Sequence, residues 1–298
     1  MTTAAASQSG TDDPGPVIDI HTHCSRIYFP RDGGVRTLLP EQMVNRMDRL
    51  GIDRAVLLAL ECPDSYSEYY LSHTVLEDAT RFPERLIPFV HLDPRSRNAG
   101  TSAAQMRDRF EQMQRLGARG CGEHKVGLPI DHPWSQEMYA ICGELGWPIL
   151  FHSDFTLNAD ENGQPGLERV VREHPNTRFI GHGPLWWAEI SGDFDRRSGT
   201  AYPKGSVAPG GSVDRLLATY PNLYGDLSAG SGYGAMTRDP GFTEGFVERH
   251  WRRLLLGTDY LRPGQDLPIV PWVRTAAMDE AHRRAIMGGN AARLLGIG

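Results

Sequence analysis

The feature that most constrains the fold of this chain is a set of eight short apolar runs spread at regular intervals. Runs of this length with few internal charges predict buried β-strands. Strands that are apolar almost throughout are typical of a parallel sheet covered by helices on both faces. The runs are 17–21, 54–60, 86–92, 118–125, 148–153, 177–182, 222–228 and 253–259.

Helix-like segments separate most of these runs. In 40–51, Met43 and Met47 fall on one face and Gly51 can end the helix. The segments 103–117 and 135–146 repeat this design. Eight strand–helix repeats predict a single α/β domain, a (β/α)8 TIM-type barrel. The alternative is a doubly wound open sheet, which usually carries a glycine-rich phosphate-binding turn that this sequence lacks.

Composition agrees with one globular domain over 17–298. The 298 residues are 40% hydrophobic and 23% charged, enough to bury a sizeable core. Residues 1–16 are small, polar and rich in Pro and Gly, which predicts a disordered lead-in without a secretory signal. The four cysteines are widely spaced, as expected for reduced thiols. We therefore expect a cytoplasmic protein that does not cross a membrane.

The charge pattern bears on binding partners. The net charge is −6, and of the 31 basic residues only Lys125 and Lys204 are lysines. This balance disfavours a general nucleic-acid or anionic-membrane binder. A small-molecule substrate is the expected partner, and a homodimer is the default oligomer.

Residue types that bind metals recur at the carboxyl ends of the predicted strands. In a barrel these ends open onto one face, where active sites lie. The first strand ends in two histidines, the fourth in a glutamate and a lysine, and later strands in histidine or aspartate. These residues are His21, His23, Glu123, Lys125, His152, His182 and Asp259.

Side chains alternate along a strand, so residues two apart share a face. His21 and His23 therefore point to the same side and can both hold one ion. Glu123 and Lys125 also share a face, with His124 opposite. Imidazole nitrogen and carboxylate oxygen both suit Zn²⁺ and similar divalent ions.

Each of these residues has a plainer interpretation. A single histidine at a strand end is more often a hydrogen-bonded structural residue, and Glu123 and Lys125 can simply pair across the barrel mouth. The recurrence at equivalent positions favours a metal site at the C-terminal mouth over a metal-free barrel that only binds a small molecule.

Several motifs resemble the amidohydrolase superfamily. They are "DIHTH" on the first strand, "FHSD" on the fifth, "IGHG" on the sixth, "LLGTDY" on the eighth and the closing "IMGGNAARLLGI". The resemblance covers about residues 17–297 and is closest to the amidohydrolase-related branch, which includes aminocarboxymuconate-semialdehyde decarboxylase-like lyases. It implies a distorted (β/α)8 barrel with a metal at the mouth.

The resemblance also implies roles for individual residues. His21, His23 and His152 would be metal ligands, and Asp259 would be both a ligand and the proton acceptor. His182 would contact either a second metal or the substrate.

The fourth strand leaves open whether the site binds one metal ion or two. "GEHKVGLPID" resembles the "GEIGLD" of TatD-like hydrolases, whose glutamate bridges two metals, which would make Glu123 a ligand. It is also similar to barrels in which a carboxylated lysine takes that place. We expect Lys125 to contact an anionic group of the substrate or Glu123 itself.

The expected function is a metal-dependent hydrolase. Hydroxide on a bound divalent ion would attack an amide, ester or lactone carbonyl, since such an ion lowers the pKa of its water to about 7. Asp259 would move the proton and His182 would stabilise charge on the carbonyl oxygen. Zn²⁺ is the first expectation for the metal, and Mn, Fe or Co suit the same ligands. The alternative is a non-oxidative decarboxylase of a small carboxylic acid on the same site.

The segment 186–212 predicts a long loop after the sixth strand. Loops of this length in a compact domain are usually functional. Trp186 opens it and is expected to bind the substrate as a wall of the pocket, with packing of the loop as the alternative.

Overall fold

The computed structural model describes residues 15–26 and 37–297, so most of the predicted lead-in lies outside the described residues. Eight parallel strands pair in sequence order, each with the next along the chain. This confirms the predicted barrel rather than an open sheet of shuffled order. The strands are β1 Ile18–Thr22, β2 Arg54–Leu58, β3 Leu86–Val90, β4 Gly120–His124, β5 Pro148–His152, β6 Arg178–His182, β7 Leu223–Asp226 and β8 Leu254–Leu255.

The barrel closes between its first and last strands. The backbone amide of Ile20 donates to the carbonyl of Leu256 at 2.8 Å, and that of Asp259 donates to the carbonyl of His21 at 2.8 Å. The chain beyond β8 therefore continues the β1 ladder although β8 itself is short. This seam brings Asp259 beside the end of β1.

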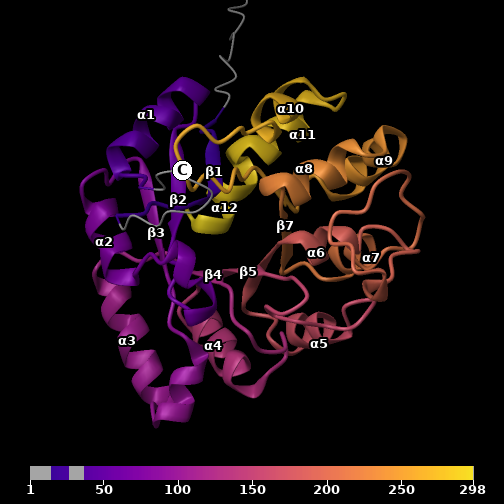
Figure 1. The fold of residues 1–298 in the computed structure, drawn as a ribbon. Helices are drawn as coiled ribbons and strands as arrows, with labels where there is room; N and C mark the ends of the chain where they lie inside the picture. The colour runs from indigo at the N-terminus through magenta and orange to yellow at the C-terminus, as the bar shows by residue number, and fades with distance from the viewer. Residues whose placement is uncertain (1–14, 27–36, 298) are drawn as a thin grey trace, which may run out of the picture.

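Helices surround the strands (Figure 1). The predicted helix 40–51 is α1, which starts at Pro40 and ends against Gly51 in the left-handed conformation (φ 59°). The helices are α1 Pro40–Leu50, α2 Ser72–Thr80, α3 Ala103–Arg115, α4 Pro133–Glu144, α5 Pro165–Glu173, α6 Pro184–Ala188, α7 Ser212–Thr219, α8 Ala229–Thr237, α9 Pro240–His250, α10 Ile269–Thr275, α11 Glu280–Arg284 and α12 Asn290–Leu295.

The interior of the barrel is a packed core and not a pore. Its centre is filled by aliphatic and aromatic side chains from the strands, with Ala291 and Leu294 of α12 added to them. A second and larger core lies between the strands and the outer helices. The strand residues of the inner core are Ile18, Ile20, Val56, Leu58, Ile87, Phe89, Leu150, Ile180 and Leu255.

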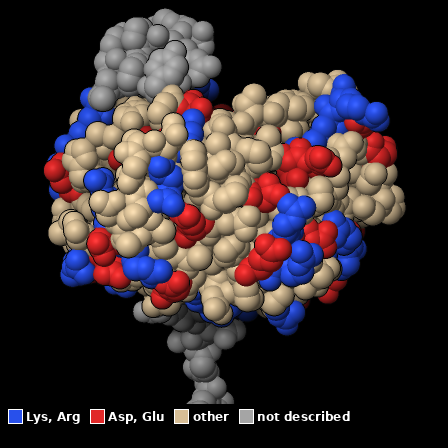
Figure 2. Space-filling view, turned by 90° about the horizontal axis from the view of Figure 1, so that it is seen from below, with Lys and Arg blue, Asp and Glu red and all other residues tan. Residues whose placement is uncertain are grey.

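The long loop predicted over 186–212 is partly helical. Its first residues belong to α6, a 3-10 turn spans Arg196–Ser198, and α7 begins at Ser212. In the part of the chain that the structure describes, no helix has the length and apolar character needed to cross a membrane. On the face shown in Figure 2, basic and acidic residues are interspersed.

Candidate metal centre at the barrel mouth

Two local irregularities aim the ligand-type residues into the mouth. The register of β1 against β2 shifts between Asp19 and Thr22. As a result, Ile20 belongs to the inner core, and the next residue, His21, also points inward to the end of β7. The Asp19 carboxylate accepts from the backbone amides of His21 at 3.1 Å and Thr258 at 2.9 Å. Asp19 thereby provides a hydrogen-bond acceptor for the amide of His21, which the bulge at this register shift removes from the β-ladder.

The fourth strand has a similar irregularity. Its register against β5 shifts between Cys121 and His124. Glu123 faces the histidines of the mouth, whereas His124 lies behind the sheet, where its Nδ1 is 2.9 Å from Nε2 of His91. This confirms the opposed faces expected for Glu123 and His124.

His21 near the end of β1 and His23 just after it present their Nε2 atoms to each other at 2.9 Å. Nδ1 of His23 lies 3.0 Å from the carbonyl oxygen of Leu58, and Nδ1 of His21 lies 2.7 Å from a carboxylate oxygen of Asp226. Both partners can only accept, so each Nδ1 carries the proton and each Nε2 carries a lone pair. Two lone pairs this close require a positive charge between them, which a proton or a metal ion supplies.

Carboxylates complete the donor set. Oδ1 of Asp259 is 3.5 Å from Nε2 of His21 and 3.6 Å from Nε2 of His23. Oε2 of Glu123 is 3.9 Å and 3.5 Å from the same two nitrogens. Within residues 15–26 and 37–297, two groups that share His21 have donor atoms close enough to hold an ion: His21, His23 and Asp259, and His21, Glu123 and His182. Imidazole and carboxylate donors with protonated, hydrogen-bonded outer nitrogens fit a divalent metal.

Asp226 and Ser228 organise this centre, although neither was predicted from the sequence as a site residue. Oδ2 of Asp226 accepts from the hydroxyl of Ser228 at 2.6 Å and lies 3.1 Å from Nδ1 of His182. The Ser228 oxygen is in turn 2.9 Å from that Nδ1. The proton of His182 therefore sits on Nδ1, and its Nε2, 3.9 Å from Oε1 of Glu123, carries a lone pair. Asp226 is the one carboxylate within the seventh predicted run, 222–228, and this was the available signal.

The charges of the centre follow from burial and neighbours. Burial lowers the pKa of His21, but the negative charges of Asp259 and Asp226 outweigh it and raise this pKa to about 9. Burial and the charge of His21 lower the pKa of His23 to about 4. One positive charge thus resides on the facing pair, as the geometry of the two Nε2 atoms requires.

Lys125 acts on Glu123 through its charge. Burial raises the pKa of the Glu123 carboxyl, but the charge of Lys125 and the hydrogen bond from His152 lower it well below its usual range. Glu123 is therefore an anion at neutral pH. A contact of Lys125 with Glu123 or with an anionic group of the substrate stays a prediction.

His152 contacts carboxylates through both ring nitrogens. Its Nδ1 is 3.0 Å from Oε1 of Glu123, and its Nε2 is 3.3 Å from Oδ2 of Asp154. Among the described residues it joins neither of the two donor groups. It lies beside Glu123 at the mouth, and its role as a ligand stays a prediction.

Trp186 lies away from the mouth. It is fully buried, its ring lies against Gly181 of β6, and it meets the ring of Phe151 edge to face with the centroids 6.0 Å apart. Phe151 belongs to the core between strands and helices. We therefore correct the expectation that Trp186 forms a wall of the substrate pocket. Its ring packs in the core between strands and helices, which was the alternative prediction. The neighbouring Trp187 donates from its indole nitrogen to the carbonyl of Asp226 at 2.8 Å.

Comparisons with solved structures give the same fold. An uncharacterized TIM-barrel protein from Bordetella bronchiseptica is 18% identical, with a TM-score of 0.66 over 94% of this chain and 98% of the other. 2,6-Dihydroxybenzoate decarboxylase from Rhizobium is 16% identical, with a TM-score of 0.59 over 94% and 98%. A probable 2-pyrone-4,6-dicarboxylic acid hydrolase from Acinetobacter baumannii is 13% identical, with a TM-score of 0.63 over 95% and 100%.

No curated protein matches the sequence. The family model described as Amidohydrolase matches residues 18–297, which is nearly all of the barrel. The match starts at β1, whose end carries His21 and His23, and it includes Asp259 after β8. By its sequence, its closed barrel and the donor set at its mouth, the chain belongs to the amidohydrolase family.

Proposed function

We propose that this protein is a metal-dependent hydrolase that attacks an amide, ester or lactone carbonyl of a small molecule. The observation that carries the proposal is the pair of carboxylates, Glu123 and Asp259, placed within 3.9 Å of the facing nitrogens of His21 and His23. Two acidic donors beside two imidazoles match a divalent cation in charge and in ligand type.

His21, His23 and Asp259 would hold the ion, with Glu123 and His182 able to hold a second one. When bound, the ion would polarise the carbonyl oxygen of the substrate and lower the pKa of a water. We favour Zn²⁺. Mn²⁺ is the second candidate because two similar decarboxylase structures contain bound manganese.

The residues of the chain supply the proton steps. The side chain of Asp259 is 20% exposed, so it is the donor-set carboxylate that a substrate in the mouth can reach. It would accept the proton of the attacking water and pass it to the leaving group. The outer hydrogen bonds that His21 and His182 donate to Asp226 keep the Nε2 lone pairs of these histidines turned toward the ion.

A decarboxylase on the same residues is the second candidate. The relatives named 2,6-dihydroxybenzoate and 5-carboxyvanillate decarboxylase favour it. In that reaction Asp259 or His182 would deliver a proton to the ring carbon that loses CO₂, and the substrate carboxylate would lie against the ion.

The test begins with the metal content of the purified protein and its activity after chelation. The protein loaded with Zn²⁺ or Mn²⁺ is then offered esters, amides, lactones and hydroxybenzoates in water enriched in ¹⁸O. Label in a new carboxyl group of the product identifies a hydrolase, and release of CO₂ with an organic product that carries no label identifies the decarboxylase. Asp259→Asn should lower kcat by about 10²–10⁴-fold. No stoichiometric ion, and no effect of chelation, would refute both.

A further inference from the structure

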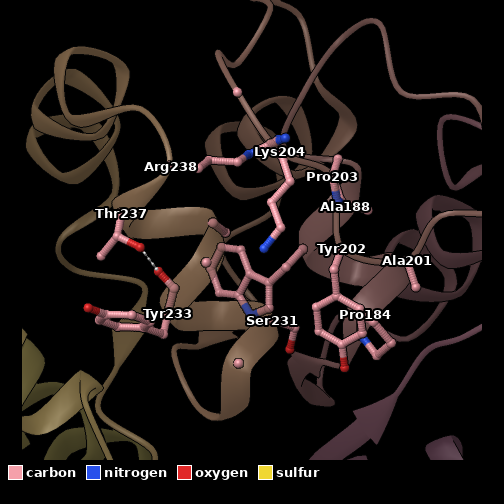
Figure 3. A pocket seen from close by; sticks show the side chains of 15 residues that line it. Pro184, Ala188, Ala201, Tyr202, Pro203, Lys204, Ser231, Tyr233, Thr237 and Arg238 are labelled. Atoms are coloured by element: carbon pink, nitrogen blue, oxygen red, sulfur yellow. Dashed lines mark hydrogen bonds between the residues drawn. The ribbon is translucent and has the colours of Figure 1, made fainter.

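A cavity of about 440 Å³ lies between α6, α8 and the segment 201–205 of the long loop (Figure 3). This volume suits a small molecule. Trp187, Tyr202 and Tyr233 give it aromatic walls, and several alanines, glycines and prolines complete the lining. Such walls accept the flat face of a ring.

The charged residues that line this cavity are all positive. Of the residues that the structure describes, Lys204 and Arg238 line it and no Asp or Glu does, although the chain as a whole has a net charge of −6. In Figure 3 the amino group of Lys204 points into the middle of the cavity. Among the residues that the structure describes, Lys204 has no ion-pair or hydrogen-bond partner.

Arg238 adds a second unmatched donor. Its Nη2 atom is buried and has no hydrogen-bond partner in the described part of the chain. Burying a guanidinium donor without an acceptor is unfavourable. An acidic group entering the cavity would provide the acceptor that Arg238 lacks and the charge that Lys204 lacks.

The cavity adjoins the metal centre. Pro184 and Ser231, which line it, lie two and three residues after His182 and Ser228 of that centre. Tyr202 shares their side of the cavity in Figure 3. Partial burial raises the pKa of the Tyr202 phenol, and the negative charge of Asp259 raises it further. Tyr202 therefore lies within electrostatic reach of the carboxylate that faces the substrate.

We propose that this cavity binds the acidic group of a small aromatic acid, with Lys204 and Arg238 as its anchors. The inference rests on the proposed function in one respect: the rest of the same molecule would reach the metal centre and react there. The substrate is then an aryl acid whose reacting group and anchoring carboxylate lie at different ends. Binding of the acid by itself needs no metal.

The experiment measures the binding of benzoate to the metal-free full-length protein by calorimetry at low salt. Benzamide, which has the same shape without the charge, is the matched ligand. Lys204→Met removes the charge of an exposed side chain and keeps its length, and Lys204→Arg restores the charge. Arg238→Met tests the second anchor. Arg109→Met, an exposed cation on α3, is the control for loss of a positive charge.

Benzoate should bind more tightly than benzamide, and Lys204→Met and Arg238→Met should each weaken it about 10-fold or more. Lys204→Arg and Arg109→Met should bind benzoate like the wild type. Equal binding of the two ligands, or benzoate binding that survives Lys204→Met but disappears in His21→Ala, would overturn the proposal. Charge-dependent binding in a protein without metal-dependent activity would refute the proposed function and leave the acid site standing.

Discussion

Replacing Asp226 by asparagine should weaken metal binding although Asp226 is not expected to touch the metal. Oδ2 accepts from His21, His182 and Ser228, while Oδ1 accepts from the backbone amide of Ser228 at 2.9 Å. The asparagine side chain has only one oxygen. Whichever way its amide turned in the Asp226→Asn variant, the NH₂ group would face an N–H or O–H donor.

The magnitude follows from the lost contacts. A hydrogen bond to a charged group contributes about 1.5–3 kcal/mol, and loss of an outer partner of a metal-bound histidine costs about 10–100-fold in affinity. We therefore expect Asp226→Asn to bind Zn²⁺ about 10–100-fold more weakly, because the lone pairs of His21 and His182 are no longer held toward the ion. Ser228→Ala, which removes only one donor to the carboxylate, should have a smaller effect.

The assay is competition for Zn²⁺ with a chromophoric chelator, with thermal unfolding measured alongside. Asp214→Asn is the matched control, because Asp214 also binds a histidine, with Oδ1 2.5 Å from Nε2 of His250, but belongs to neither donor group. Affinity within about twofold of wild type in a folded Asp226→Asn protein would refute the reasoning.

Three further perturbations test the centre, the long loop and the outer helices. A divalent ion at 100 times its Kd should raise the free energy of unfolding by about 2.7 kcal/mol, and differential scanning calorimetry should show no such gain in His21→Ala. Trp186→Phe should lower the free energy of unfolding in urea by about 1–3 kcal/mol yet leave KM unchanged, because the ring packs behind the sheet. A large rise in KM would show that Trp186 contacts the substrate. Asp214→Asn should destabilise the protein by about 1–2 kcal/mol at pH 7. Burial raises the pKa of Asp214, but hydrogen bonds from Arg249 and His250 lower it below the ordinary value. The stabilisation is therefore complete above about pH 4 and lost as pH falls through the lowered pKa, so the gap between mutant and wild type should close in acid.

The eight strands were predictable because each is a short apolar run, and all eight fall within the predicted limits or one residue beyond them. The last strand differs most, since the ladder was expected over 253–259 but β8 is only Leu254–Leu255. Gly257 lies so close to Asp226 that a Cβ at this position would be 2.0 Å from Oδ1. The chain leaves regular pairing there, a contact between distant segments that no local pattern contains.

The donor set was predictable in kind but not in its supports. His21 and His23 were expected on one face, yet strict alternation would have turned them away from Ile18 and Ile20, which fill the barrel. The bulge in β1 lets both the isoleucines and the histidines face the barrel interior. This bulge depends on the carboxylate of Asp19, which could not be distinguished from a surface carboxylate by sequence alone. The role of Asp226 could not be predicted for a related reason. It depends on which strands lie beside β7, and that adjacency is set by the closed barrel rather than by any local sequence pattern.

Because the donor residues lie on both sides of the seam between β1 and β8, the proposed metal would also hold the barrel closed. His23 and Asp259 are 236 residues apart in the sequence, and their donor atoms lie 3.6 Å apart across the seam. An ion bound to both would cross-link the first and last strands, and closing a loop of this length costs the free chain about 5 kcal/mol of entropy. Loading the ion should therefore protect the amides of this seam from hydrogen exchange more than those between any other pair of strands.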